Sequence, residues 1–178
     1  MLEEQELDLH IVAFYEDLRA GELAKEIFDR IRSRVPRDTN TTPGLWRFDL
    51  LQHARWQELG AADVADAVVI IVAAQGTRPL PNSLLDCVAK GLVQKRLARV
   101  GLVAILDCPD EIANQALPPY RQLQALCRNA KLRFFSLPSR NLIPTPAPDD
   151  SFRFGASRLT DNFPRLESRS YRGWGIND

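Results

Sequence analysis

The sequence predicts an α/β fold, a three-layer doubly wound sandwich around a five-stranded, mainly parallel sheet. Three short apolar runs, at residues 9–14, 67–74 and 100–106, have the continuous apolar character of strands buried on both faces. Stretches with the apolar spacing of helices lie between these runs. Because parallel strands are joined by right-handed helical crossovers, five such strands favour the order 2-1-3-4-5.

In the first part of the chain, a strand over residues 9–14 leads into a helix over residues 19–35. Apolar side chains recur every four residues in this helix, and Pro36 ends it. Residues 37–44 form a polar loop. Residues 45–51 begin with alternating apolar and polar side chains and then break the alternation, which predicts a strand at an edge of the sheet.

Later elements follow the same rhythm. A short turn or helix over residues 53–60 precedes the third strand, residues 67–74, which is apolar throughout. The remaining expected elements are a helix at 82–97, a strand at 100–106, a helix at 118–130 and a strand at 132–137.

The character of the chain changes at about Pro138, which divides it into an α/β domain at residues 1–138 and a tail at residues 139–178. Prolines in the tail predict extended structure without a long helix. Large aromatic side chains predict that the tail docks on a surface, since a fully solvated tail has few of them. Tyr171 and Trp174 are the expected docking residues. The surface on which they dock belongs to the same chain, to a protein partner or to a second copy in a homodimer.

Composition disfavours several classes of function. The formal net charge is zero, so no strong positive field is available for nucleic acid binding. No apolar run has the length of a membrane span, and the acidic first residues do not resemble a secretory signal, so we expect a cytoplasmic protein without membrane association. The spacing of the three cysteines matches no metal-binding motif, which predicts buried, reduced thiols and no metal site.

A site in such a sheet is expected beyond the carboxyl ends of the strands, where the strand order reverses. In the order 2-1-3-4-5 this place is the crevice between the first and third strands. Glycyl, hydroxyl and guanidinium groups in the loop after the third strand suit an anion. The candidate ligand-binding residues are Tyr15, Glu16, Asp17, Gln75, Gly76, Thr77 and Asp107.

The acidic pair Glu16-Asp17 after the first strand resembles the pair that helps to hold magnesium in response-regulator receiver domains. That resemblance implies a phosphate-accepting Asp at the end of the third strand, where this chain has Ala73-Ala74-Gln75. It also implies a Thr or Ser after the fourth strand and a Lys after the fifth, where the chain has Asp107 and Leu137-Pro138-Ser139. The similarity therefore implies a degenerate receiver that cannot accept a phosphoryl group.

The architecture also resembles flavodoxins, which hold the flavin phosphate on the loop after the first strand. The two carboxylates in that loop would repel a phosphate, so we expect no bound cofactor there. A structural interpretation of the acidic pair is also open, because acidic side chains next to the amino end of a helix cap it and offset its dipole. The stretches Trp46–Asp49 and Arg172–Asn177 are similar to parts of uncharacterised bacterial proteins, and this similarity implies no activity.

The sequence thus favours a non-catalytic flavodoxin-like, receiver-like domain for signalling or protein association over an enzyme. An enzyme or cofactor-binding protein that holds an anionic small molecule, such as a flavin or nucleotide, in the crevice is the alternative.

Overall fold

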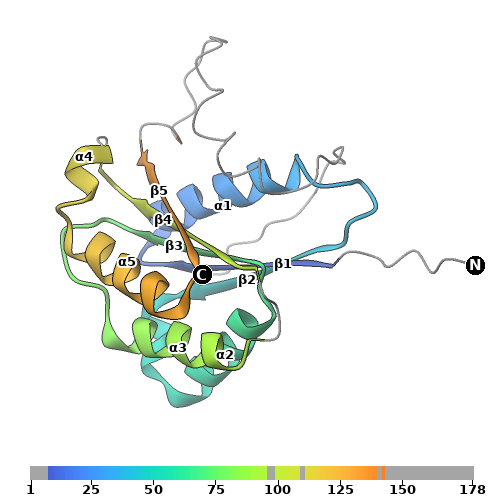
Figure 1. Ribbon diagram of the computed structural model, residues 1–178, viewed down its shortest axis with the longest axis horizontal. Helices are drawn as coiled ribbons and strands as arrows, with labels where there is room; N and C mark the ends of the chain where they lie inside the picture. Colours follow the sequence, from blue (N-terminus) through green and yellow to red (C-terminus); the bar gives the residue numbers. More distant parts are fainter. Residues whose placement is uncertain (1–7, 96–98, 109–110, 140–141, 143–178) are drawn as a thin grey trace, which may run out of the picture.

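The computed structural model describes residues 8–95, 99–108, 111–139 and 142. Its centre is a parallel sheet with the strand order β2-β1-β3-β4-β5, which confirms the expected fold class and topology (Figure 1). The strands are β1 (Leu9–Tyr15), β2 (Thr41–Arg47), β3 (Val69–Ala74), β4 (Gly101–Leu106) and β5 (Arg133–Pro138). The extended tail expected after residue 138 lies outside the described residues, apart from residues 139 and 142.

Helices cover both faces of the sheet, so the three expected layers are present. The long helices are α1 (Leu18–Arg32), α2 (Ala54–Asp66), α3 (Asn82–Val93) and α5 (Pro118–Ala130), and the shorter ones are the 3₁₀-helix η1 (Phe48–Gln52) and α4 (Glu111–Asn114). In Figure 1, α1 lies above the sheet, while α2, α3 and α5 lie below it. None of the helices in the described part of the chain has the length and apolarity required to cross a membrane.

Two apolar layers form the core because neighbouring side chains on a strand point to opposite faces. In β1, Val12 and Phe14 pack on the side of α2 and α3, whereas Ile11 and Ala13 pack under α1. The same alternation holds in β3, whose six residues are all buried. The continuous apolar runs thus arise because the central strands are buried on both faces.

The second strand differs from its prediction. It was expected at residues 45–51, but β2 begins at Thr41, in the segment expected to be a loop, and ends at Arg47. Only one side of β2 is paired, so Pro43 costs no hydrogen bond to a second neighbour. Phe48 and Leu51, which follow β2, are three residues apart and both buried. This spacing suits the 3₁₀-helix that they form part of.

Helix α2 is longer than the short turn or helix expected at residues 53–60. It continues through Gly60 to Asp66, because its small buried residues let it pack closely against α3. At the contact, a Cβ atom on Gly91 of α3 would lie 2.5 Å from the Ala61 carbonyl oxygen and 2.5 Å from Val64 Cβ. A side chain at position 91 would therefore force these two helices apart.

Other boundaries move by a few residues. Helix α1 ends at Arg32, three residues before the expected end, and a turn connects it to Pro36. Helix α3 ends at Val93, four residues before the expected end. The third strand begins at Val69, because Ala67 still bonds to the end of α2. Helix α4 was not expected, since four residues are too few to show an apolar period.

Lys95 lies just beyond α3 and closes the carboxyl end of α2. Its Nζ atom donates to the Val64 carbonyl oxygen at 2.9 Å and to the Ala67 carbonyl oxygen. A cation at this end also suits the helix dipole. Burial lowers the pKa of Lys95 to about 8, although the Asp66 carboxylate acts in the opposite direction.

This pKa predicts a pH-dependent stability contribution. Between pH 8 and the ordinary lysine pKa of 10.5, the folded protein has lost the Lys95 proton while the unfolded chain keeps it. The unfolded state then binds more protons, so the free energy of unfolding rises with pH in this window. Urea unfolding should therefore show wild-type protein gaining stability relative to Lys95→Met as pH rises from 8 to 10.5.

Lys90→Met is the matched control, because Lys90 lies on α3, five residues before Lys95, and its Nζ atom lies 3.7 Å from the exposed Glu58 carboxylate. The difference between wild type and this control should stay nearly constant over the same range. A constant or falling difference for Lys95→Met would contradict the burial of the charged amine.

Candidate functional site

The carboxyl ends of β1, β3 and β4 meet at the edge of the sheet where the strand order reverses. The connection from β1 leads to β2 on one side, and the connection from β3 leads to β4 on the other. Backbone hydrogen bonds continue beyond the strands: the Glu16 amide donates to the Ala73 carbonyl at 3.0 Å, and the Asp107 amide donates to the Ala74 carbonyl at 3.0 Å. These bonds place two carboxylates on either side of the end of β3.

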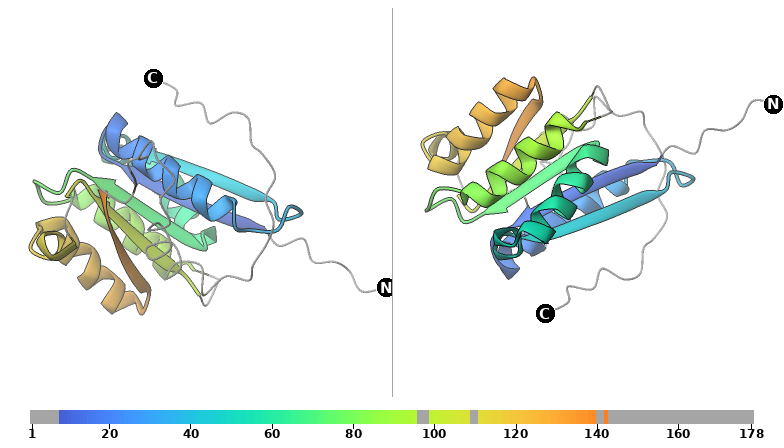
Figure 2. Two further views of the ribbon diagram at one scale, coloured as in Figure 1. Left: turned by 90° about the horizontal axis from the view of Figure 1, so that it is seen from above. Right: turned by 90° about the horizontal axis from the view of Figure 1, so that it is seen from below.

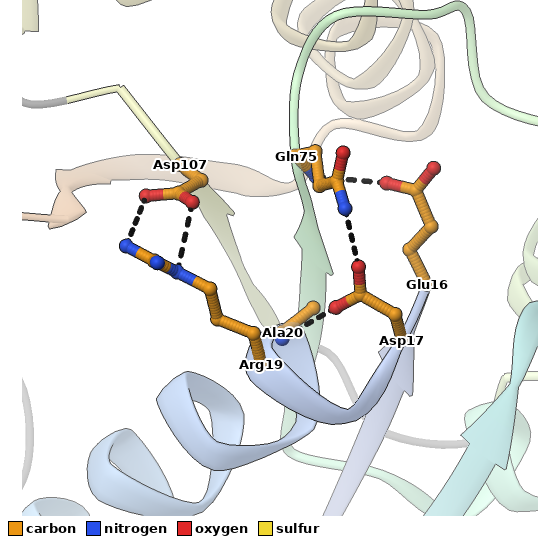
Figure 3. Close-up of polar contacts among 6 residues, drawn as sticks. All are labelled: Glu16, Asp17, Arg19, Ala20, Gln75 and Asp107. Atoms are coloured by element: carbon orange, nitrogen blue, oxygen red, sulfur yellow. Dashed lines mark hydrogen bonds and ion pairs between the residues drawn. The ribbon is translucent and has the colours of Figure 1, made fainter.

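Glu16 ties β1 to the loop that follows β3. Its Oε2 atom accepts a hydrogen bond from the Gln75 backbone N–H at 2.8 Å (Figure 3). Its Oε1 atom lies 3.8 Å from Nη2 of Arg78, further along the same loop. The Glu16 side chain therefore satisfies a backbone donor of the loop and faces one of its cations.

Asp17 has two structural tasks. Its Oδ1 atom accepts from the Ala20 backbone N–H at 2.9 Å, which caps the amino end of α1. Its Oδ2 atom accepts from the Gln75 side-chain amide at 2.5 Å. Gln75 thus contacts both members of the acidic pair, one through its backbone and the other through its side chain, as Figure 3 shows.

Arg19 and Asp107 form a two-pronged ion pair between α1 and the end of β4. The Nε–Oδ2 distance is 2.9 Å and the Nη2–Oδ1 distance is 3.3 Å. The planar guanidinium matches the two carboxylate oxygens, which fixes the direction of both side chains. Because the arginine side chain is largely exposed, the pair contributes little stability, about 0–1 kcal/mol.

We call these residues the switch-point cluster: Glu16, Asp17, Arg19, Gln75, Arg78 and Asp107. Each of its six carboxylate oxygens faces an N–H group or a guanidinium. Three carboxylates against two guanidinium groups leave a formal charge of minus one, which does not attract an anion. The cluster is therefore internally paired.

The other predicted site residues lie around this cluster without a polar contact to it among the described interactions. The Tyr15 ring packs against Gly21 of α1. Gly76 is buried and has a φ of +84°, a backbone conformation that other residues rarely adopt, and a Cβ atom there would lie 2.9 Å from Leu117 Cδ1, which would have to shift. Thr77 is exposed beside it. Tyr171 and Trp174, the expected docking residues, lie outside the described residues.

Positions that would carry receiver chemistry hold other residues. Buried Ala73 and Ala74 end β3, and Pro138 ends β5 opposite Leu106. Asp107 follows β4, but its carboxylate is held by Arg19. Within the described ranges, no group of three or more His, Cys, Asp or Glu side chains is placed to hold a metal ion.

The histidine and the cysteines of the core are held by packing. His10 lies at the start of β1 with its Nε2 atom 3.7 Å from Oδ1 of Asp63, whose Oδ2 atom accepts from the Trp46 indole at 2.7 Å. Burial raises the pKa values of Cys87 and Cys127 to about 12, so these thiols are not reactive. Cys108 is half-buried rather than buried as expected, and none of the three cysteines forms a disulfide.

Sequence reasoning did not include Arg19 among the candidate residues. Arg19 stands two residues after the acidic pair, at the start of a helix, and its partner follows β4. The signal was the unlike charge after β1 and after β4, whose carboxyl ends lie on either side of β3, but only the direction of α1 shows that the two side chains meet.

Comparison of the chain with protein-family models, with curated proteins and with solved structures finds no significant match. The resemblance to receivers and flavodoxins stays a prediction from the residues.

The cap on α1 gives a prediction for the cluster. Replacing Asp17 with Ala removes the acceptor for the Ala20 amide and for Gln75, so the free energy of unfolding should fall by about 1–2 kcal/mol. Asp17→Asn keeps an acceptor oxygen at the cap and should cost only a few tenths of a kcal/mol. Urea unfolding measures both, and equal losses in the two variants would show that the cap does not stabilise α1.

Proposed function

We propose that this protein is a non-catalytic, flavodoxin-like domain of degenerate receiver type that acts by associating with another protein in a signalling process. The internal pairing of the switch-point cluster carries this proposal. In a domain that binds magnesium and a phosphoryl group, carboxylates at this edge are needed as open ligands. Here Glu16 and Asp17 instead hold the loop after β3, and Asp107 holds α1.

The surface around the cluster supports association. Leu18, in the first turn of α1, is 59% exposed, and Ile112, in α4, is 78% exposed. The amino end of α1 and helix α4 lie at the same end of the sheet (Figure 1). Leu18 directly precedes the exposed Arg19, and arginine is enriched at protein contact surfaces.

The alternative is an anionic small molecule, such as a flavin or nucleotide, bound at the same edge. The exposed guanidinium groups of Arg19 and Arg78 and the turn at Gly76 favour it. To bind them, such an anion must displace the carboxylates of Asp107 and Glu16, which lowers its affinity. Three cysteines that form no disulfide suit a reducing compartment, and we place the protein in the cytoplasm.

Arginine substitutions at the exposed apolar residues test the proposal. The protein, with a photo-crosslinker in α1, is expressed in cells of its source, and its crosslinked partners are identified by mass spectrometry. Leu18→Arg and Ile112→Arg should each reduce the yield of a specific adduct about tenfold, because a buried charge at an interface is costly. Val93→Arg is the matched control: Val93 is 87% exposed, but lies at the other end of the sheet.

The control should leave both the adduct and the melting temperature unchanged. An equal loss of adduct in all three variants would contradict a contact surface at this edge. Native mass spectrometry of the same preparation tests the alternative, since a stoichiometric flavin or nucleotide that is lost in Arg78→Ala would establish the small-molecule site instead.

A further inference from the structure

Asn114, the last residue of α4, has a polar side chain in the interior of the molecule. The residue is 0% exposed, and neither Nδ2 nor Oδ1 of its amide has a hydrogen-bond partner among the described residues. Its backbone is engaged, because the Leu117 amide donates to the Asn114 carbonyl oxygen at 3.0 Å, at the corner between α4 and α5. Burial of an amide without hydrogen bonds is costly, so buried amides in folded proteins are paired with protein groups or with ordered water.

A second buried polar atom lies on the sheet below this corner. The Oγ atom of Ser136 in β5 is buried and has no hydrogen-bond partner within the described ranges. Phe135 and Leu137, the residues on either side of it, pack in the apolar cluster under α1, so the Ser136 side chain points to the opposite face. On that face the Phe134 ring contacts the ring of Tyr120 in α5, with 5.1 Å between the centroids. The Ser136 hydroxyl therefore lies on the α5 side of β5.

Helix α4 packs against β5 on this same side. Its residues contact β5, and Figure 1 and Figure 2 show α4 and α5 on one side of that strand. Asn114 is buried, whereas its neighbours Ala113 and Gln115 are exposed, so Asn114 is the residue that this end of α4 turns inward. The Asn114 amide and the Ser136 hydroxyl thus belong to one contact between α4 and β5.

The chemistry of these groups selects what can bind between them. An amide offers both a donor and an acceptor, and a hydroxyl offers the same pair. An anion would face the carbonyl oxygen of Asn114, and a cation would face its NH₂ group, so a neutral group that both donates and accepts suits them best. A buried water molecule typically makes about three hydrogen bonds to otherwise unpaired groups, and Nδ2, Oδ1 and Oγ supply that number. The complete burial of Asn114 disfavours a larger ligand.

We propose that a buried water molecule joins the Asn114 amide of α4 to the Ser136 hydroxyl of β5. Helix α4 has four residues, which is too short for a helix to be stable through its own hydrogen bonds, so contacts with the sheet must hold it. The water supplies such a contact at the carboxyl end of β5. The bridge goes beyond the proposed function and does not depend on it, since it forms within the chain whether or not a partner contacts Ile112 of α4.

A crystal structure of the full-length protein at about 2 Å resolution or better tests the bridge directly. The expected result is a water molecule within hydrogen-bond distance of the Asn114 amide and of Ser136 Oγ. A direct hydrogen bond between the two side chains, or pairing of the Asn114 amide with backbone groups alone, would overturn the proposal. So would a dry contact in which both groups remain unpaired.

Urea unfolding of Asn114→Leu, Ser136→Ala and the double variant tests the bridge in solution. Each single change should raise the unfolding equilibrium constant, because it leaves the water and the opposite group short of a partner. The double variant should unfold with a constant about threefold or more below the product of the two single effects, since the second change no longer breaks a bridge. Effects that multiply without this coupling would contradict a shared water.

Gln115→Leu provides the matched control cycle with Ser136→Ala. Gln115 is exposed and directly follows Asn114, so the same polar-to-apolar change is made outside the contact. The two changes should multiply to within about twofold. Coupling as large as that of the Asn114 cycle would show that the effect does not come from the bridge. If Asn114→Leu does not fold, Asn114→Ala takes its place, and the same coupling to Ser136→Ala is expected.

Discussion

All five strands run in the same direction, so every loop that leaves a carboxyl end gathers at one edge of the sheet. Parallel pairing makes this arrangement unavoidable, and it brings the charges after β1, β3 and β4 together although they lie far apart in sequence. A chain with this topology can pair these charges with one another, or leave them open to solvent and to a ligand. In this protein Glu16, Asp17 and Asp107 are paired with groups from the neighbouring loops and from α1.

Individually the contacts of the switch-point cluster are weak, because most of the arginine surface is in water. These contacts matter because they connect segments that lie far apart in the sequence. Asp17 joins the cap of α1 to the loop after β3, so the first turn of the helix and that loop hold each other in place. Gly76, with a φ of +84°, adds a turn that favours glycine in the same loop, next to Leu117. Contacts within the chain thus hold the loop after β3 and the first turn of α1 together at this edge.

The sheet could be predicted from the sequence because its central strands are buried on both faces, which removes the polar residues that otherwise hide a strand. The edge strand β2 was misplaced because it lacks this burial. It has one paired side and half-exposed residues, so Thr41, Pro43 and Gly44 resemble a loop. Helix α2 was underestimated because Gly60 suggests a break, whereas tight packing against α3 is the reason for a small residue there.

The candidate site shows a similar division. Topology alone placed Glu16, Asp17, Gln75 and Asp107 at one edge, and the structure brings all four into the same cluster. What the sequence could not show is the direction of each side chain, and hence that these groups satisfy one another. The contribution of Arg19 depends on the angle at which α1 leaves the edge.

A crystal structure of the full-length protein grown with magnesium and inorganic phosphate tests the internal pairing of the switch-point cluster most directly. The account predicts that the Gln75 amide stays bonded to Glu16, that Arg19 stays bonded to Asp107, and that no ion lies between them. Magnesium bound by Glu16 and Asp17, or phosphate held between Arg19 and Arg78 with their carboxylate partners displaced, would contradict it.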